Sequence, residues 1–206
     1  MKRLIKAIEE QLRKGIPEER VSGRDKLLGK TFRSLGIPLK QVRETISKVY
    51  EENPEISGKV CIGIAEKLLT REFYEEKISA ILLLGRLIKD RQIVSFSFLE
   101  KLMMSYIDEW SLCDTFATEV LAPRLQADWD IGQGVLIKWS KSQNEWLRRC
   151  ALVGLVKCKG KIPNWQEFSQ ALLANFTNKV LTAWLSTLFQ RPLLEKNLEI
   201  LYQHVF

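Results

Sequence analysis

The chain has 206 residues, of which 46% are hydrophobic and 28% are charged, and its formal net charge is +7. These values are typical of an ordinary soluble globular protein, and we expect one domain over residues 1–206. No apolar stretch is long enough to span a bilayer, and the N-terminal residues mix acids with bases, which excludes a signal peptide, so we expect a cytoplasmic protein.

Helical periodicity follows the chain from end to end, interrupted by short segments with Gly or Pro. In chain order, the expected helices cover residues 1–14, 22–34, 38–53, 56–69, 72–90, 95–107, 110–122, 130–141, 144–158, 164–175, 178–190 and 192–204. No stretch of alternating residues outcompetes the helical pattern, and no Asn-Gly or Asp-Gly dipeptide signals a hairpin. The sequence therefore predicts an all-α protein.

Short helices with tight connections favour stacked antiparallel pairs. Their spacing fits a helical repeat of roughly forty residues, of the HEAT or armadillo type. We expect a HEAT-like solenoid, an α-α superhelix that curves around a concave groove.

Charge is spread unevenly along this expected solenoid. Residues 1–50 hold 13 Lys and Arg against 6 Asp and Glu, residues 51–130 hold 9 against 15, and residues 131–206 hold 10 against 4. Basic ends on the arms of a curve favour a rod-like polyanion through counterion release. The simpler alternative is that these charges only solvate helix faces.

The expected helix 110–122 carries a carboxylate at the edge of its apolar stripe. The stripe consists of Cys113, Phe116, Ala117, Val120 and Leu121. Trp110 and Asp114 are four residues apart, so they share a face on the flank of the stripe. A buried charge without a partner is costly, so we expect Asp114 to be compensated or used. The alternative is a solvated acid near a helix N-terminus.

The expected helix 144–158 carries an arginine opposite its core stripe. The stripe is formed by Leu147, Ala151, Gly154 and Leu155, while Trp146, Arg149 and Val153 lie on nearly the opposite side. We expect this side to face a groove, where the forked donors of Arg149 suit phosphate. The alternative is a surface arginine whose stem lies over Trp146. In the expected helix 178–190, the stripe places Trp184 in the core.

The cysteines give no sign of a metal site. Cys61, Cys113, Cys150 and Cys158 form no CxxC pair, and His204 is the only histidine. A zinc site needs a closer set of soft ligands. We expect reduced, mostly buried thiols, and no metal.

Four segments together resemble the DNA alkylation repair glycosylases built from HEAT-like repeats, the bacterial AlkD family. "FRSLGIPLKQVRETISKVY" is similar to a Leu-Gly-Ile/Val element followed by a helix with an early arginine. "WSLCD" is similar to the family's Trp-x-x-x-Asp element, "NEWLRRCA" to its Trp-Leu-x-Arg-x-Ala element, and "KVLTAWLSTL" to a later helix that carries a tryptophan. The segments follow the family order and spread over most of the chain.

The resemblance implies excision of cationic N-alkylpurines, such as 3-methyladenine and 7-methylguanine, from duplex DNA in base excision repair. It implies no metal and no cofactor. By motif, Trp110, Asp114 and Trp184 would line the catalytic site on the concave face. Arg149 would contact the DNA backbone, and Arg148 and Trp146 of the same motif are further DNA-binding candidates. We expect a monomer that associates with alkylated DNA in the nucleoid.

This chemistry suits the residues. The departure of a cationic purine builds oxocarbenium character on the deoxyribose, and a fixed carboxylate such as Asp114 stabilises that charge. The same carboxylate can position or deprotonate the attacking water. Tryptophan faces favour a cation. In this interpretation the substrate itself is the compensating partner of Asp114.

The chain departs from the family pattern at several points. Leu27 stands where the family often has a tyrosine, Pro38 where it often has a polar residue, and the segment after Trp184 lacks a common arginine. The C-terminal part is also short. These departures favour a second reading, a non-catalytic HEAT-repeat protein that binds branched or damaged DNA. The acidic middle favours a third, a protein-binding helical-repeat scaffold.

Overall fold

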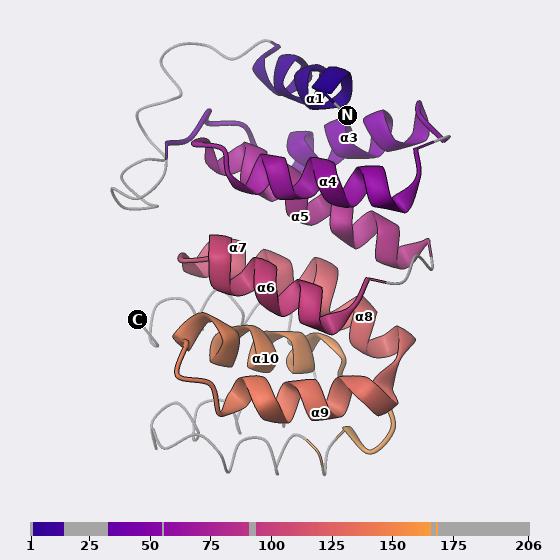
Figure 1. Cartoon of the computed structure of the whole chain (residues 1–206), viewed down its shortest axis with the longest axis vertical. Coiled ribbons are helices and arrows are strands. Elements are labelled where there is room, and N and C mark those ends of the chain that lie inside the picture. Colours follow the sequence, from indigo (N-terminus) through magenta and orange to yellow (C-terminus); the bar gives the residue numbers. More distant parts are fainter. Residues whose placement is uncertain (1, 15–32, 55, 91–93, 166–167, 169–206) are drawn as a thin grey trace.

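The computed structural model describes residues 2–14, 33–54, 56–90, 94–165 and 168. Within these ranges every regular element is a helix, and successive helices stack as antiparallel pairs along one long axis (Figure 1). The all-α helical-repeat fold predicted from the sequence is confirmed. None of the described helices is long and apolar enough to cross a membrane. One domain over residues 1–206 stays a prediction.

The helices follow the predicted order. They are α1 (Lys2–Arg13), α3 (Leu39–Glu51), α4 (Gly58–Leu69), α5 (Tyr74–Lys89), α6 (Phe96–Tyr106), α7 (Trp110–Phe116), the π-helical turn η2 (Ala117–Leu121), α8 (Ala122–Ala127), α9 (Trp129–Ser140) and α10 (Glu145–Lys157). Most of the helix expected at 22–34, almost all of the one at 164–175, and those at 178–190 and 192–204 lie outside the described residues.

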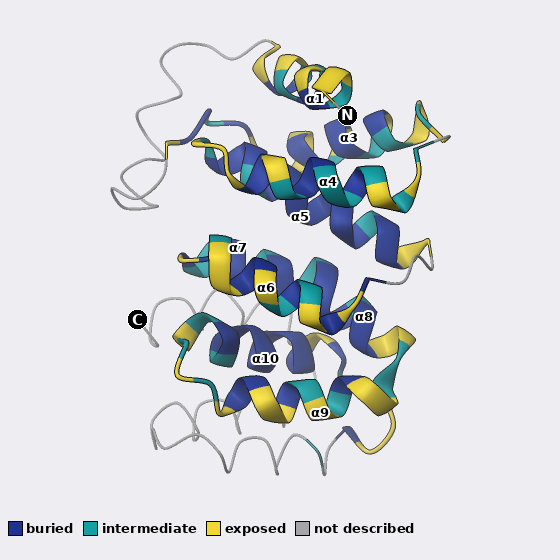
Figure 2. Cartoon of the chain, in the orientation of Figure 1, coloured by how far each residue is buried: buried dark blue, intermediate teal, exposed yellow. Residues whose placement is uncertain are grey.

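The described helices form two layers. In one layer, side-chain contacts join α4, α6 and α9: Lys101 pairs with Glu66 at 3.4 Å, and Lys138 pairs with Glu100 at 2.8 Å. In the other, α3 packs on α5, α5 on η2, and η2 and α7 on α10. Exposed residues are frequent on α4, α6 and α9, whereas α5 and α10 are buried on almost every side (Figure 2).

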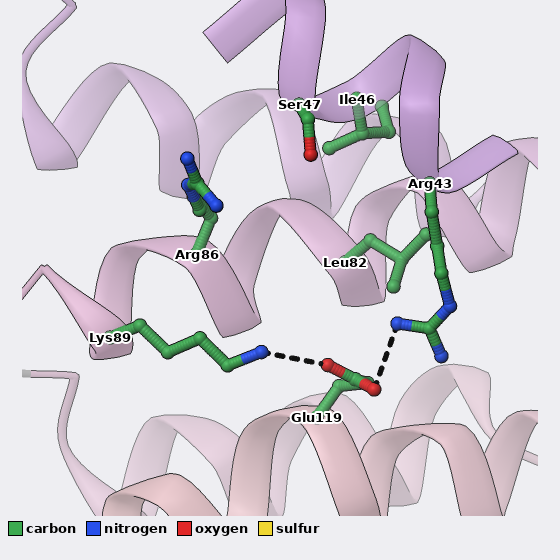
Figure 3. A pocket seen from close by; sticks show the side chains of 7 residues that line it. All are labelled: Arg43, Ile46, Ser47, Leu82, Arg86, Lys89 and Glu119. Atoms are coloured by element: carbon green, nitrogen blue, oxygen red, sulfur yellow. Dashed lines mark hydrogen bonds and ion pairs between the residues drawn. The ribbon is translucent and has the colours of Figure 1, made fainter. Parts of the chain in front are cut away.

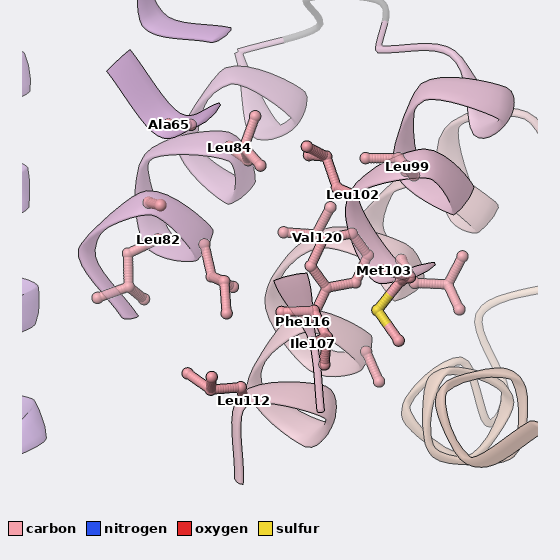
Figure 4. Close-up of a cluster of buried hydrophobic side chains, with 14 of the residues drawn as sticks. Ala65, Leu82, Leu84, Leu99, Leu102, Met103, Ile107, Leu112, Phe116 and Val120 are labelled. Carbon is pink, nitrogen blue, oxygen red and sulfur yellow. The ribbon is translucent and has the colours of Figure 1, made fainter. Parts of the chain in front are cut away.

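The core runs between the layers without interruption. Leu84 of α5, Leu99 and Leu102 of α6, and Phe116 and Val120 of the α7–η2 run meet in one apolar cluster (Figure 4). The stripe predicted for residues 110–122 is confirmed, because all of its members are fully buried: Cys113, Phe116, Ala117, Val120 and Leu121. The flank of this stripe, where Asp114 lies, therefore has a fixed position relative to the core.

A buried carboxylate anchors the segment that leads into α3. Glu75 accepts hydrogen bonds from the Ser34 hydroxyl at 2.7 Å and from the backbone N–H of Leu35 at 2.8 Å and of Ile37 at 3.3 Å. The sequence placed Arg33 and Ser34 at the end of a helix, which is wrong. Arg33 instead forms a parallel backbone bridge with the residue before α5, and the Glu75 carboxylate holds the following residues in a non-helical conformation.

The helix that starts at Trp110 continues past the predicted end at residue 122 because it widens by one residue. Pro123 has no N–H and its ring crowds the carbonyl four residues earlier, so a regular helix is blocked there. In η2 the Ala122 N–H instead donates to Ala117, five residues earlier, and the helix continues as α8. The freed Glu119 carbonyl turns toward α5, where a Cβ on Gly85 would lie only 2.5 Å from its oxygen. Glycine at position 85 therefore allows α5 and η2 to pack closely.

We expect Gly85→Ala to destabilise the fold by about 1–3 kcal/mol, because a rigid backbone carbonyl occupies the space of the new methyl group. The control is Gly134→Ala in the middle of α9, where a Cβ meets nothing within 4 Å. That change should stabilise the protein by about 0.5–1 kcal/mol through helix propensity. Urea unfolding of both variants measures the difference, and equal stabilities would contradict the close packing of α5 on η2.

Candidate functional site

The start of α7 positions Trp110 and Asp114. Glu109 caps this helix: one carboxylate oxygen accepts from the Ser111 N–H at 2.9 Å and the other from the Leu112 N–H at 3.0 Å. Burial raises the pKa of Glu109 above its usual value, although the two backbone donors oppose that rise. Trp110 is the first residue of α7 and is half-buried, and Asp114 follows one turn later, as the spacing predicts.

Asp114 forms a buried, two-pronged ion pair with Arg149 of α10. Arg149 Nε donates to Oδ1 of Asp114 at 2.7 Å, and Nη2 donates to Oδ2 at 2.8 Å. The exposed fractions of the two side chains are 6% for Asp114 and 7% for Arg149. Two parallel bonds between planar groups fix both distance and orientation. The pair therefore locks α7 to α10 and holds the carboxylate in one geometry.

This geometry corrects two expectations. The sequence interpretation left Asp114 to be compensated by a substrate, but Arg149 compensates it within the protein. The expectation that α10 presents Arg149 and Val153 on an open face is also wrong, because α10 packs against α7 and η2 and both side chains are buried. Contact between Arg149 and DNA stays a prediction that requires this pair to rearrange.

Two buried thiols lie beside the ion pair. Burial raises the pKa of Cys113 well above its usual value, and both the hydrogen bond with Cys150 and the charge of Asp114 act in the same direction. The Cys113 thiol donates to the backbone oxygen of Trp146 at 3.3 Å. All four cysteines are free and buried, as predicted. Cys113 therefore acts as a neutral packing group that ties α7 to the start of α10.

The remaining predicted site residues have different surroundings. Trp146 is half-buried and packs against the core. The guanidinium of Arg148 turns back to the loop before α10 and donates to the carbonyls of Ser142 at 2.8 Å and Gln143 at 2.9 Å. Trp184 and Leu27 lie outside the described residues. The structure thus brings Trp110, Asp114 and Arg149 together in one place.

A second polar centre lies where α3, α5 and η2 meet. It is a pocket of about 150 Å³ between these elements (Figure 3). The lining residues are Arg43, Ile46, Ser47, Leu82, Arg86, Lys89 and Glu119. Most of the polar lining is cationic, and Glu119 is the one acid in it.

Glu119 bridges two of these cations. Arg43 donates to Oε1 of Glu119 at 2.9 Å, and Lys89 donates to Oε2 at 3.0 Å. Burial by itself would raise the pKa of Glu119, but the hydrogen bond from Lys89 and the charge of Arg43 outweigh it and lower that pKa. These residues lie far apart in the sequence, so no spacing predicts their meeting. The one feature of the sequence that bears on this meeting is Pro123, because it forces the wide turn that carries Glu119.

Neither centre offers a set of metal ligands. Within the part of the chain that the structure describes, no group of three or more His, Cys, Asp or Glu side chains is placed to hold a metal ion. The chemistry available at the two centres is that of fixed charges, hydrogen bonds and aromatic faces.

Residues 8–188 match the sequence profile of a family described as "DNA alkylation repair enzyme". Among curated protein sequences, none is significantly similar to this chain. The fold is similar to that of a protein described as "Predicted DNA alkylation repair enzyme from Enterococcus faecalis". The TM-score is 0.67, the sequence identity is 14%, and the match covers 82% of this chain and 78% of that one.

We expect Arg149→Met to cost about 3–5 kcal/mol of unfolding free energy, because it leaves the Asp114 carboxylate buried without a counter-charge. The double variant Asp114→Asn with Arg149→Met should recover a large part of this loss, since neither charge remains. A double-mutant cycle by urea unfolding measures the coupling.

The control for this cycle is the exposed pair of Arg33 and Glu72, whose nitrogen and oxygen are 3.1 Å apart. Arg33→Met should change stability by no more than about 1 kcal/mol, as is usual for a solvated pair. Equal losses for Arg149→Met and Arg33→Met would show that the buried pair does not hold α7 to α10.

Proposed function

The chain belongs to the DNA alkylation repair enzyme family, and from this premise we propose that it is a DNA N-glycosylase. Its substrates are cationic alkylated purines of the 3-methyladenine and 7-methylguanine type, excised from duplex DNA in base excision repair. Asp114 and Trp110 form the described part of the catalytic site, and Trp184 joins them by motif. Trp146 and Arg148 contact DNA nearby.

The observation that carries the proposal is the fixed carboxylate of Asp114 one helical turn from the half-buried Trp110. Loss of a cationic purine requires no strong acid, because the base already carries the positive charge of a good leaving group. The barrier lies in the positive charge that develops on the deoxyribose. A carboxylate that needs no reorganisation stabilises that charge as it forms, and the face of Trp110 favours a cation beside it.

Arg149 acts on this chemistry through Asp114. It occupies one acceptor position on each carboxylate oxygen, and each oxygen has a second lone pair. The remaining lone pairs are the ones that orient a water toward the sugar. Arg149 is therefore proposed as a positioning residue that fixes the plane of the carboxylate, whereas the contact with the DNA backbone that the motif implies would require Arg149 to leave this pair.

The acidic middle of the chain, residues 51–130, repels DNA less than its count of acidic residues suggests. Residues 51–130 contain 15 acids, and among those that the structure describes, Glu75, Glu76, Glu109 and Asp114 are buried. Buried acids with partners add little to the surface field. This observation favours a DNA partner over the protein-binding scaffold, because that alternative rests on an acidic surface.

We expect Asp114→Asn to slow the release of 7-methylguanine by roughly 10² or more, because it keeps the shape of the side chain but removes the stabilising charge. The measurement is a single-turnover assay on methylated duplex DNA with protein in excess, so that all DNA is bound. Thermal unfolding of the variant, compared with the wild type, separates lost catalysis from lost fold.

The matched control is Asp130→Asn, the same chemical change at an exposed position in the first turn of α9. It should release base at the wild-type rate. Equal, non-zero rates for Asp114→Asn and the wild type would rule out the catalytic role of Asp114. A wild-type protein that binds DNA in a salt-dependent way but releases no base would support the non-catalytic alternative.

A further inference from the structure

The lining of the pocket between α3, α5 and η2 carries more positive than negative charge. Arg43, Arg86 and Lys89 line it with a single acid, Glu119. The side chains of Arg43 and Lys89 are 42% and 53% exposed, whereas Glu119 is only 17% exposed. The cations therefore stand at the mouth of the pocket, and the carboxylate lies beneath them.

Arg86 keeps one unsatisfied donor. Its Nη2 donates to Glu51 at 3.0 Å and its guanidinium lies 5.7 Å from the centre of the Tyr50 ring, but its Nε is buried and has no hydrogen-bond partner among the described residues. Burying a charged donor without an acceptor costs free energy, so an unsatisfied donor of this kind in a native structure calls for an explanation, such as a ligand that binds there. The hydroxyl side chain of Ser47 points into the same pocket (Figure 3), where it adds a polar group of the kind that commonly contacts phosphate.

The carboxylate of Glu119 takes the place that an anion would take. Its two oxygens accept from Arg43 and Lys89 at 2.9 and 3.0 Å, as two oxygens of a phosphodiester would. From this arrangement we infer that the pocket is a second DNA-binding site, which takes one backbone phosphodiester of duplex DNA between Arg43, Arg86 and Lys89. Glu119 competes with that phosphate for the same donors, and so sets how strongly the protein holds undamaged DNA.

The position of the pocket suits this role, and the inference rests on the proposed function because that function supplies the duplex. Glu119 follows Asp114 by five residues on one helical run, which spans about 7 Å at the rise of a helix. Along the helix axis, the pocket therefore lies close to Asp114. The competing structural explanation is that Arg43 and Lys89 only tie α3 and α5 to η2.

Two variants separate these explanations, because they are expected to change affinity in opposite directions. Lys89→Gln should weaken binding of an undamaged duplex oligonucleotide several-fold and lower the slope of log K against log salt by about one. Glu119→Gln should tighten binding several-fold and steepen the slope, because Arg43 and Lys89 lose their internal partner. Fluorescence anisotropy of the labelled duplex, from about 50 to 200 mM salt, measures both quantities.

The control is Lys101→Gln, which removes the same charge from an exposed ion pair on α6, in the other layer of the fold. It should bind as the wild type does. Arg86→Gln is a further variant that leaves the Arg43–Glu119–Lys89 bridge intact, and it should weaken binding and lower the slope as Lys89→Gln does. Its result decides the matter if thermal unfolding shows that Glu119→Gln is not folded.

The inference is overturned if folded Glu119→Gln binds DNA no more tightly than the wild type, or if Lys89→Gln and Arg86→Gln behave as Lys101→Gln does. Base release by the wild type, measured on methylated duplex, then still stands as support for the glycosylase. Conversely, absent base release with the expected changes in affinity leaves the phosphate site supported and the catalytic proposal refuted.

Discussion

The bidentate ion pair of Asp114 and Arg149 is the constraint on which the lower half of the described structure depends. Moving each ion of a buried pair out of water costs roughly several kcal/mol of desolvation free energy, and only a close, well-aligned partner offsets that cost. With bonds of 2.7 and 2.8 Å, α7 and α10 cannot slide or rotate without exposing an uncompensated charge. The packing of Phe116 and Val120 and the thiol of Cys113 then add stability to an arrangement that the charges have already selected.

Charge has different tasks in the two layers. On α4, α6 and α9 the ion pairs involve solvated lysines, as at Lys101 and Lys138, and such pairs contribute little to stability. In the other layer, the carboxylates of Glu75 and Glu119 are buried or half-buried, and each is held by several donors. A net charge counted along the sequence cannot distinguish these cases, which explains why an acidic middle segment is compatible with a DNA-binding surface.

Periodicity predicted the parts of the molecule that depend on local chemistry. The helix order, the buried stripe at residues 113–121 and the shared face of Trp110 and Asp114 follow from residue spacing alone. Periodicity could not predict that α10 is covered on both sides, because the covering helix α7 is distant in sequence; Arg149 was therefore expected on an open face. Periodicity could not predict the ion pairs of Glu119 with Arg43 and Lys89 either, because these residues are also distant in the sequence. Trp184, known only from its motif, lies outside the described residues.

The π-helical turn makes one helix serve two neighbours. A single extra residue between α7 and α8 shifts the angular register of everything that follows by about 100°. Asp114, which precedes the turn, pairs with Arg149 of α10, while Glu119, which lies inside the turn, pairs with Arg43 of α3 and Lys89 of α5. Deleting one residue from 117–121 would remove the wide turn that accommodates Pro123 and would rotate Asp114 and Glu119 relative to each other by about 100°. The length of this helical run, and not only the identity of its residues, thus decides which neighbours the two charged centres reach.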